Sequence, residues 1–557
     1  SILVQGRGFS DDQAVWFSGA GLQVGSTRLT PEGLQIPFTV DANAAEGYRS
    51  LRVLGPGGWS NALRIRVDHL VGLPEREPNE GNGDATPLTP ESAVEAELGE
   101  ADVDEFPVRG DPGATLTVEV ESRRLGVSIS PALSLTDAQG RPIRPKAARL
   151  GLDGDPRIMM TVPGDGHFRI QVRDLLYRGG AGVAYRLRVT TDRYPTGLFP
   201  LGGPAGSSLR VQALGGNLGD PQEFTARLPT EPGWTIAVEE FSGPTGRSLT
   251  SHRLVAGDLP ELREGRAVST EVRSEPFIWN GRIDVPGEID RLRVRVVAGV
   301  PLSLQVEAAV LGSWLDSVLE VRDERGVLLA ENDDAPSLLA SPDRIGQPTP
   351  DSRIDWTPER DGVVTLELTD RASRGGPEFA YRLRVGPRRD DFAIVLLPSP
   401  TTMGISDRSS WQGAFNLPRG TTTRIPFRVI AEGKLGPVTV LAEGLPDGVV
   451  CPPVVLSPPP SNLGARSTFR EAMGVLRLEA SASAPGSAAA DRLRFVGEAR
   501  SGGNTWLRRH AEASVPFPDR SLAEPIRAVQ SRQASFPVAV VPLNAIAIDS
   551  TKEVSTP

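Results

Sequence analysis

The hexapeptide AYRLRV occurs at Ala184–Val189 and again at Ala380–Val385, 196 positions apart (380 − 184). Each copy ends a longer match, DGHFRIQVRDLLYRGGAGVAYRLRV from Asp165 and DGVVTLELTDRASRGGPEFAYRLRV from Asp361. Self-similarity of this length is the signature of an internal duplication. The repeated segment therefore predicts that one chain builds the same structural unit twice.

The match continues upstream at a smaller offset. LTDAQGR at Leu135 aligns with VRDERGV at Val321, and LPERE at Leu73 aligns with LPELRE at Leu259, in both cases 186 positions apart (321 − 135, 259 − 73). The second copy therefore carries about ten extra residues, and insertions of that size fall in surface loops. We place this loop at about residues 330–350, where four prolines disfavour a central strand: Pro336, Pro342, Pro348 and Pro350.

Apolar residues inside the repeated unit alternate with polar ones, as strands require. In the first AYRLRV, the side chains of Tyr185, Leu187 and Val189 share one face of a strand, and those of Arg186 and Arg188 share the other. We expect the apolar face to lie on the core and the arginine face to be solvated. The 60 Gly and 50 Pro interrupt the chain throughout, which disfavours helices and predicts an all-β protein.

Several motifs resemble a known family in the right order. EREPNEGNGDATPL at Glu75, a D-x-D-x-F strand, DG-x-F/V and the closing Y-R-L-R-V resemble the bacterial pre-peptidase C-terminal (PPC) domain. The second copy, with LDSVLEVRDERGVLLAENDDA from Leu315, resembles it more closely. That family is a jelly-roll-like β-sandwich attached to secreted enzymes and surface proteins. The resemblance implies such sandwiches at 71–190 and 259–387.

The remaining segments resemble immunoglobulin-like domains. VQGRGFSDDQAVWFSG near the start and GWSNALRIRV at Gly58 resemble an IPT/TIG domain, which implies an N-terminally truncated module at 1–70 and a divergent one at 191–258. LPRGTTTRIPFRV and LGPVTVLAEGLPDGVV resemble the Ig-like sandwiches of bacterial surface proteins and imply a module at 388–520, followed by a C-terminal extension at 521–557. The expected fold is thus all-β, with tandem jelly-roll-like and immunoglobulin-like β-sandwich modules.

The composition disfavours several classes of function. The net charge of −10 and the absence of a basic stretch make nucleic acid an unexpected partner, and no window of about 18 apolar residues predicts a transmembrane segment. The four histidines stand outside catalytic motifs, and Cys451 is the only cysteine. Because Ser1 begins inside a strand pattern, we expect the chain to be a segment of a longer protein.

One group of acidic residues is a candidate metal-binding site. Together with Asn332, five carboxylates of the second copy are expected to meet in loops and strand ends: Asp316, Asp333, Asp334, Asp351 and Asp355. Ca²⁺ prefers six to eight oxygen ligands, and relatives of the PPC family bind calcium through such a loop. At the matched positions the first copy has residues without a carboxylate, namely Ser130, Ala147, Ala148 and Met159, and only Asp351 keeps an acidic partner, Asp155. A calcium site confined to the second copy and a solvated acidic turn both remain open.

These observations predict no enzyme and no cofactor other than calcium. We expect a non-catalytic, extracytoplasmic scaffold or adhesion region of a bacterial surface, located in the periplasm, on the cell surface or outside the cell. Its expected partners are other surface or extracellular proteins, or polysaccharide, in a larger complex. The alternative is an ancillary, non-catalytic region of a larger secreted hydrolase or peptidase. A catalytic domain adjoining this segment would favour that alternative, and further β-modules would favour the scaffold.

Overall fold

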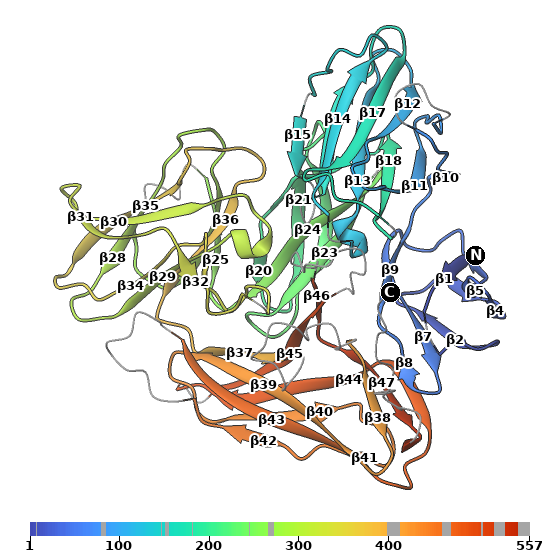
Figure 1. Ribbon diagram of the computed structural model, residues 1–557. Coiled ribbons are helices and arrows are strands. Elements are labelled where there is room, and N and C mark those ends of the chain that lie inside the picture. The colour runs from blue at the N-terminus through green and yellow to red at the C-terminus, as the bar shows by residue number, and fades with distance from the viewer. Residues whose placement is uncertain are drawn as a thin grey trace.

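The computed structural model is built from strands and confirms the tandem β-sandwich fold (Figure 1). Its described helical elements are two single 3₁₀ turns, η1 (Arg123–Leu125) and η3 (Ala309–Leu311). The structure describes residues 1–6, 8–79, 85–127, 129–145, 147–150, 155–180, 182–243, 246–265, 272–342, 344–397, 413–458, 469–502, 505–516 and 530–543.

The first repeat comprises β10 to β18. A six-stranded sheet, ordered β10-β11-β18-β13-β16-β15, faces a three-stranded sheet, ordered β12-β17-β14. The apolar residues of the closing strand β18, which are Tyr185, Leu187 and Val189, lie in the core between the sheets. The strands are β10 (Val71–Pro74), β11 (Ser92–Glu97), β12 (Asp104–Arg109), β13 (Thr115–Glu121), β14 (Pro131–Asp137), β15 (Ala147–Leu150), β16 (Pro156–Thr161), β17 (His167–Asp174) and β18 (Ala184–Thr190).

The second repeat, β25 to β36, keeps the order of the inner strands and differs at the sheet edges. Its sheets run β25-β27-β36-β29-β34 and β26-β28-β35-β30-β31, so β36 lies between β27 and β29 as β18 lies between β11 and β13. The expectation that both AYRLRV strands occupy equivalent positions is confirmed. The strands are β25 (Glu261–Arg263), β26 (Val272–Arg273), β27 (Phe277–Arg282), β28 (Asp290–Val296), β29 (Leu302–Glu307), β30 (Ser317–Arg322), β31 (Leu328–Asn332), β32 (Ala335–Pro336), β33 (Pro348–Thr349), β34 (Arg353–Trp356), β35 (Gly362–Asp370) and β36 (Ala380–Gly386).

The insertion of the second repeat is an excursion between the paired two-residue strands β32 and β33, as the prolines predicted. Its tip is not simply a surface loop, however. Ala340 and Ile345 are buried against the C-terminal part of the chain, and Arg428 donates hydrogen bonds to the carbonyls of Pro342 and Ile345. The expectation of a surface loop was incomplete, because apolar residues on the insertion pack against another sandwich.

A smaller sandwich precedes each repeat in the chain. The N-terminal sandwich has a core that includes Leu34, Ile36 and Leu51; its strands are β1 (Ile2–Val4), β2 (Ala14–Phe17), β3 (Leu22–Val24), β4 (Arg28–Thr30), β5 (Gly33–Ile36), β6 (Phe38–Val40), β7 (Gly47–Gly55), β8 (Gly58–Trp59) and β9 (Leu63–Val67). The connecting sandwich lies between the repeats in the chain; its strands are β19 (Gly197–Phe199), β20 (Gly202–Pro204), β21 (Ser208–Leu214), β22 (Gln222–Arg227), β23 (Thr235–Gly243) and β24 (Gly246–Gly257).

The C-terminal sandwich corrects one predicted boundary. Residues 521–557 were expected to form an extension, but β47 pairs with both β38 and β44, and Phe536 and Val538 lie in the core. The boundary at 520 was wrong because these apolar residues complete the sandwich. The strands are β37 (Asp391–Leu396), β38 (Phe415–Pro418), β39 (Thr422–Glu432), β40 (Val438–Glu443), β41 (Val449–Val450), β42 (Val454–Leu456), β43 (Arg470–Ala480), β44 (Ser487–Arg500), β45 (Trp506–Pro516), β46 (Gln530–Gln533) and β47 (Phe536–Val541).

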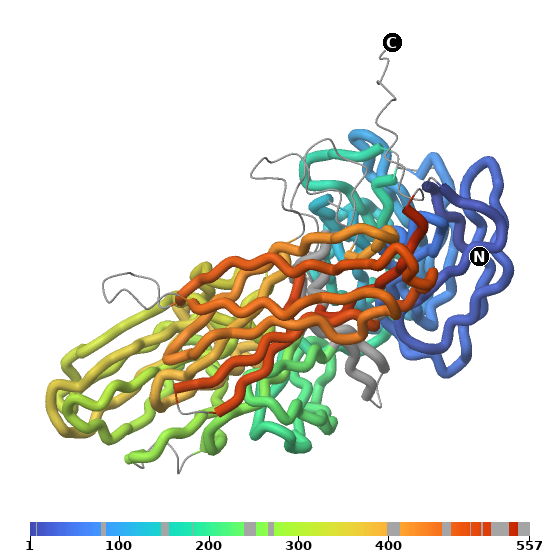
Figure 2. Tube along the Cα trace, turned by 90° about the horizontal axis from the view of Figure 1, so that it is seen from below, coloured from blue at the N-terminus to red at the C-terminus, as the bar shows by residue number. Residues whose placement is uncertain are grey.

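The sandwiches pack into one body rather than a line, with the C-terminal sandwich lying along the others (Figures 1 and 2). The Trp59 indole donates to the carbonyl of Val538 at 3.3 Å, and the Asn416 amide bonds the Trp59 backbone N–H and carbonyl at 2.9 Å each. Gly58 has φ +100°, and a Cβ there would meet Asn416 Oδ1 at 2.2 Å, so only glycine fits. The last sandwich therefore closes back onto the first.

The arginine face of the first repeat is buried, contrary to the expectation of a solvated face. Arg186 is 8% exposed and Arg188 is 5% exposed. Arg188 pairs with Glu119 at 3.0 Å, and Arg186 pairs at 2.9 Å with Asp68, which follows the last strand of the N-terminal sandwich. From that sandwich Arg66 also reaches Glu121 of β13 at 2.8 Å. The face is therefore the junction between two sandwiches.

The second repeat buries its arginine face in the same way. Arg382 is 1% exposed and contacts Glu307 and Glu261, each at 2.5 Å. Arg384 pairs with Asp258, which follows the last strand of the connecting sandwich, at 2.8 Å. On the same sheet, Arg353 forms two hydrogen bonds with Glu432 of the C-terminal sandwich. Both repeats thus use the outer face of the same sheet to hold their neighbours.

We expect Arg382→Ala to destabilise the second repeat by about 3–5 kcal/mol, because Glu261 and Glu307, which have little access to solvent, lose the guanidinium that they share. Arg291→Ala is the matched control. Its side chain is 53% exposed and pairs with Glu367, so its loss should cost at most about 1 kcal/mol. Calorimetric unfolding of both variants measures the difference. Equal effects would show that the buried arginine contributes no more than a surface ion pair.

Candidate metal centre

The predicted acidic cluster of the second repeat is assembled only in part. Arg371 contacts the carboxylates of both Asp333 and Asp334, the second at 4.0 Å. Burial, and then the negative charge of Asp334, raise the pKa of Asp316, so these groups interact. The guanidinium of Arg371 already supplies positive charge to this loop. The described geometry is that of an acidic turn with an arginine counter-ion.

Asp351 and Asp355 do not join that cluster, and their assignment to one site is corrected. The Asp351 carboxylate accepts the backbone N–H groups of η3, at 3.2 Å from Ala308, 2.7 Å from Ala309 and 3.1 Å from Val310. Asp355 instead accepts a hydrogen bond from Ser303 Oγ at 2.6 Å. Neither carboxylate is directed at the acidic turn, because each satisfies local donors.

The duplication explains why Asp351 has a structural role. In the first repeat Asp155 accepts the N–H groups of Ser122, Arg123 and Arg124 around η1. This was the one acidic position that both copies share. Its carboxylate satisfies the otherwise unpaired amides at the start of a 3₁₀ turn, a requirement of the backbone in either copy. Asn332 is likewise engaged, since its Oδ1 accepts the N–H of Arg353 at 2.8 Å.

A different carboxylate cluster lies in the first repeat. Glu75, Glu77 and Asp104 each offer an oxygen, and these oxygens lie within 4.8 Å of one another. Glu75 directly follows β10, and Asp104 begins β12, so the packing of the two sheets brings them together. The Asn79 backbone N–H donates to Glu77 at 2.9 Å, and its Nδ2 donates to both glutamates, so hydrogen bonds hold these three side chains together. The cluster joins a sheet edge to the opposite sheet.

Burial makes ionisation of these carboxyl groups unfavourable. Burial, together with the charges of neighbouring carboxylates, raises the pKa of Glu75 to about 7, against the lowering effect of the hydrogen bond from the Glu97 backbone. It also raises the pKa of Asp104 to about 8, although the Tyr185 hydroxyl donates to Asp104. No arginine lies among the causes of either shift. The cluster therefore favours a bound cation or a bound proton.

Two buried oxygens at the cluster lack hydrogen-bond partners among the described residues. They are Oδ1 of Asp104 and Oδ1 of Asn79, both in residues with no solvent exposure. The Asn79 Nδ2 donates to Glu75 at 3.2 Å and to Glu77 at 2.8 Å. It therefore occupies the position between the two carboxylates that a bridging ion would take. A flip of the amide would turn Oδ1 into the cluster. Carboxylate and amide oxygens are the donors that Ca²⁺ prefers, so these residues fit calcium.

Sequence reasoning quoted this stretch, EREPN, for its resemblance but overlooked it as a ligand set. The alternation of two glutamates and an asparagine, 29 positions before Asp104 (104 − 75), was the available signal. What could not be read from it was that β12 would bring Asp104 to the same point. Residues 80–84, which follow Asn79, lie outside the described residues.

At the corresponding place in the second repeat, the acidic side chains have different partners. Glu261 is engaged by Arg382 and by the Asn280 amide, whose Nδ2 lies 2.6 Å from it. Asp290 accepts the Tyr381 hydroxyl at 2.7 Å, as Asp104 accepts Tyr185. Burial, followed by the charge of Glu264, raises the pKa of Asp290 to about 8. A proton on Asp290 therefore neutralises this position near pH 7.

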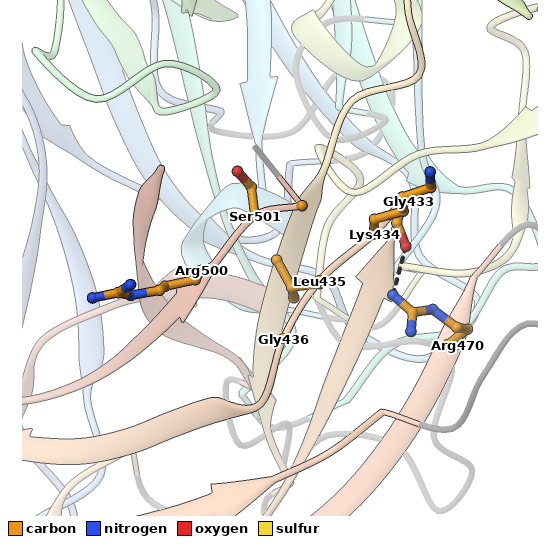
Figure 3. A pocket seen from close by; sticks show the side chains of 8 residues that line it. Gly433, Lys434, Leu435, Gly436, Arg470, Arg500 and Ser501 are labelled. Carbon is orange, nitrogen blue, oxygen red and sulfur yellow. Dashed lines mark hydrogen bonds between the residues drawn. The ribbon is translucent and has the colours of Figure 1, made fainter. Parts of the chain in front are cut away.

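A basic pocket of about 510 Å³ lies on the C-terminal sandwich (Figure 3). Lys434, Arg470 and Arg500 contribute to its lining, and Arg470 donates to the carbonyl of Gly433 at 2.7 Å. It is wide open to solvent and lacks a convergent set of polar groups with a buried wall. We therefore assign it no ligand. The described part of the chain also contains no helix with the length and apolarity that a bilayer crossing requires.

Comparison with known proteins yields no family assignment, since no family model and no curated protein matches the chain. Solved structures overlap weakly. A tetra-tandem repeat from the extending region of a large adhesion protein shares 10% identity over 90% of this chain and 92% of its own, with a TM-score of 0.13. The M60 catalytic domain with two CBM51 domains from Clostridium perfringens ZmpB shares 10% identity over 69% of this chain and 56% of its own, also with a TM-score of 0.13.

A third overlap is with trypsin-activated alpha-2-macroglobulin from Escherichia coli, at 9% identity over 96% of this chain and 47% of that one, with a TM-score of 0.14. Scores this low carry no argument about what the chain does. The fold and the sites above therefore rest on the residues and contacts of this chain alone.

We expect calcium to raise the melting temperature of the wild-type chain relative to a chelator, because it relieves the repulsion between Glu75, Glu77 and Asp104. At ten times its Kd the ion would add about 1.4 kcal/mol. The double variant Glu75→Gln/Glu77→Gln should lose this response. The control, Asp333→Ala/Asp334→Ala, should keep it, because Arg371 already balances that turn. Loss of the calcium response in Asp333→Ala/Asp334→Ala, with its retention in Glu75→Gln/Glu77→Gln, would instead place the calcium site in the second repeat.

We also expect the stability of the second repeat to fall as pH rises from about 4 to about 8. The pKa of Asp290 is about 8 in the folded chain and about 4 in the unfolded chain, so the folded state holds the extra proton over this interval. Asp290→Asn should flatten the decline, whereas neutralising the exposed Glu324 by Glu324→Gln should not. Melting curves across this pH range, in excess calcium, measure the slope. An unchanged slope in Asp290→Asn would contradict the assignment.

Proposed function

We propose that this chain is a non-catalytic, extracytoplasmic scaffold region of a bacterial surface or secreted protein. In this proposal, its PPC-like repeats and its IPT/TIG-like and Ig-like sandwiches hold binding surfaces in fixed relative positions. The partners would be other surface proteins or polysaccharide, in a larger assembly. The observation that carries the proposal is the use of both repeats' arginine faces as buried junctions with their neighbours.

Buried ion pairs suit a scaffold because their geometry is exacting. A guanidinium without solvent must keep its carboxylates at hydrogen-bond distance, so sliding or rotation at a junction leaves a buried charge uncompensated. Sandwiches joined through short surface contacts would instead move independently. At the second repeat, Arg353 and Glu432 join the C-terminal sandwich, and Asp391 there pairs with Arg389 and Arg509. These contacts support a rigid platform rather than a flexible spacer.

Calcium has a structural role in this proposal. An ion held by Glu75, Glu77, Asp104 and the Asn79 amide oxygen would tie β10, at the entrance of the first repeat, to β12 in the opposite sheet. The entrance strand directly follows the junction with the N-terminal sandwich, where Asp68 binds Arg186. Neutralising the cluster would therefore stiffen the first repeat near the point at which it meets its neighbour.

We expect the purified chain to scatter X-rays as one compact particle, with a radius of gyration of about 24 Å, the value for a globular chain of this length. It should also fail to turn over peptide, ester and glycoside substrates. Trp59→Ala combined with Asn416→Ala should enlarge the particle by opening the contact between the first and last sandwiches. Trp506→Ala, at a side chain that is 60% exposed, is the control and should not.

An extended, variable particle would overturn the rigid platform. Turnover that disappears on replacing a single residue would overturn the non-catalytic assignment. A catalytic domain found next to this segment in the full-length protein would favour the ancillary-region alternative over an independent scaffold. These results are distinguishable, because particle shape, turnover and gene context are measured separately.

A further inference from the structure

His69 lies at the junction between the N-terminal sandwich and the first repeat, two residues after β9 ends. Its Nδ1 is 3.0 Å from Glu46 Oε1 of the N-terminal sandwich. Its Nε2 is 3.1 Å from Glu91 Oε2, in the turn before β11, and 4.0 Å from Asp192 Oδ1, just after β18. Three segments that are distant in the sequence thus place carboxylates around one imidazole.

The two carboxylates at the ring nitrogens require positive charge at His69, from either a second proton or a metal ion. A neutral imidazole carries one N–H, and placing it on Nδ1 satisfies Glu46. The lone pair of Nε2 then faces the Glu91 carboxylate at 3.1 Å, which is repulsive unless positive charge lies between them. Asp192 adds further negative charge. Its Oδ2 is buried without a hydrogen-bond partner among the described residues, and its contact with Arg188 Nη2 is 3.9 Å long.

We propose that His69 Nε2, Glu91 Oε2 and Asp192 form a binding site for a divalent transition-metal ion of the zinc class. Their ligand atoms lie within 4.8 Å of one another. A tetrahedral zinc ion with bonds of about 2.0 Å needs ligand atoms about 3.3 Å apart. The Nε2–Oε2 distance of 3.1 Å already suits this, and Asp192 has to approach by a fraction of an ångström. Water would complete the coordination.

The surrounding contacts are those that hold a metal ligand in place. Glu46, bonded to Nδ1, fixes the imidazole with Nε2 directed at the ion, the usual carboxylate–histidine–metal arrangement. The other oxygen of Glu91 accepts the Thr191 N–H at 2.8 Å and the Thr191 hydroxyl at 2.6 Å. The imidazole favours zinc over calcium, which prefers oxygen ligands. This site is therefore chemically distinct from the Glu75 cluster.

A metal ion here would clamp the junction. It would join the segment after β9 to the turn before β11 and to the segment after β18, which leads to the connecting sandwich. The same junction already holds the ion pairs of Asp68 with Arg186 and Arg188. Zinc would thus add a second, reversible link beside a permanent one, and the rigidity of the junction would depend on metal supply.

The test is zinc titration by calorimetry on the full chain, stripped by chelator and then held in excess calcium to fill the oxygen-rich cluster. Wild-type chain should bind one zinc ion, and His69→Gln should abolish this binding. Glu46→Gln should weaken the affinity about 10–100-fold, because it removes the partner that orients the imidazole. The exposed histidine His167 provides the control, and His167→Gln should bind as the wild type does.

A melting curve of each variant without zinc confirms that the substitution leaves the fold intact. Absence of zinc binding by the wild type would overturn the proposal and assign the missing cation to a proton on His69. Zinc binding of equal affinity in His69→Gln would overturn it too, because the ion would then lie elsewhere. Loss of binding in His69→Gln with retention in His167→Gln would support it.

Discussion

The architecture depends on keeping buried guanidinium groups paired. In each repeat the closing strand directs apolar residues into its own sandwich and two arginines outward, and the outward face is covered by a neighbouring sandwich. Burial opposes ionisation of Glu119, yet Arg124, Arg157 and Arg188 hold its pKa well below the usual range. The carboxylates and arginines therefore stay charged, and each requires the other. Removing one partner costs more than the pair itself contributes.

This requirement explains why the sandwiches form one body. Apolar contacts between modules tolerate sliding, because the hydrophobic effect has no direction. A buried ion pair does not, because its hydrogen bonds are directional and no water replaces them. The apolar insertion tip at Ala340 and Ile345 and the contact of Trp59 with Val538 then add area to junctions whose geometry the ion pairs set.

The duplication supplies an internal comparison of how a buried carboxylate is neutralised. Both copies place a tyrosine hydroxyl on an aspartate, Tyr185 on Asp104 and Tyr381 on Asp290. Around Asp104 the first copy gathers Glu75 and Glu77, a set of oxygens that fits a metal ion. The second copy directs Arg382 to the matching Glu261 and holds a proton on Asp290. Burial raises the pKa of both aspartates to about 8, so the two copies differ in the positive charge that Arg382 supplies to Glu261.

The sequence by itself determined the duplication, the all-β fold and the equivalent places of the AYRLRV strands, because alternation and repeat offsets are local properties of the chain. It also determined the apolar face of β18, with Tyr185, Leu187 and Val189. Only the tertiary structure decided the other face. The alternation of apolar and polar residues shows that Arg186 lies on the polar face of its strand, but not whether its side chain contacts water or Asp68. That depends on where the N-terminal sandwich packs, which the alternation does not determine. The candidate metal ligands follow the same rule. Asp351 accepts backbone amides at η3. Asp104 reaches Glu75 through the packing of two sheets, and Asp192 reaches Glu91 through the pairing of β11 with β18.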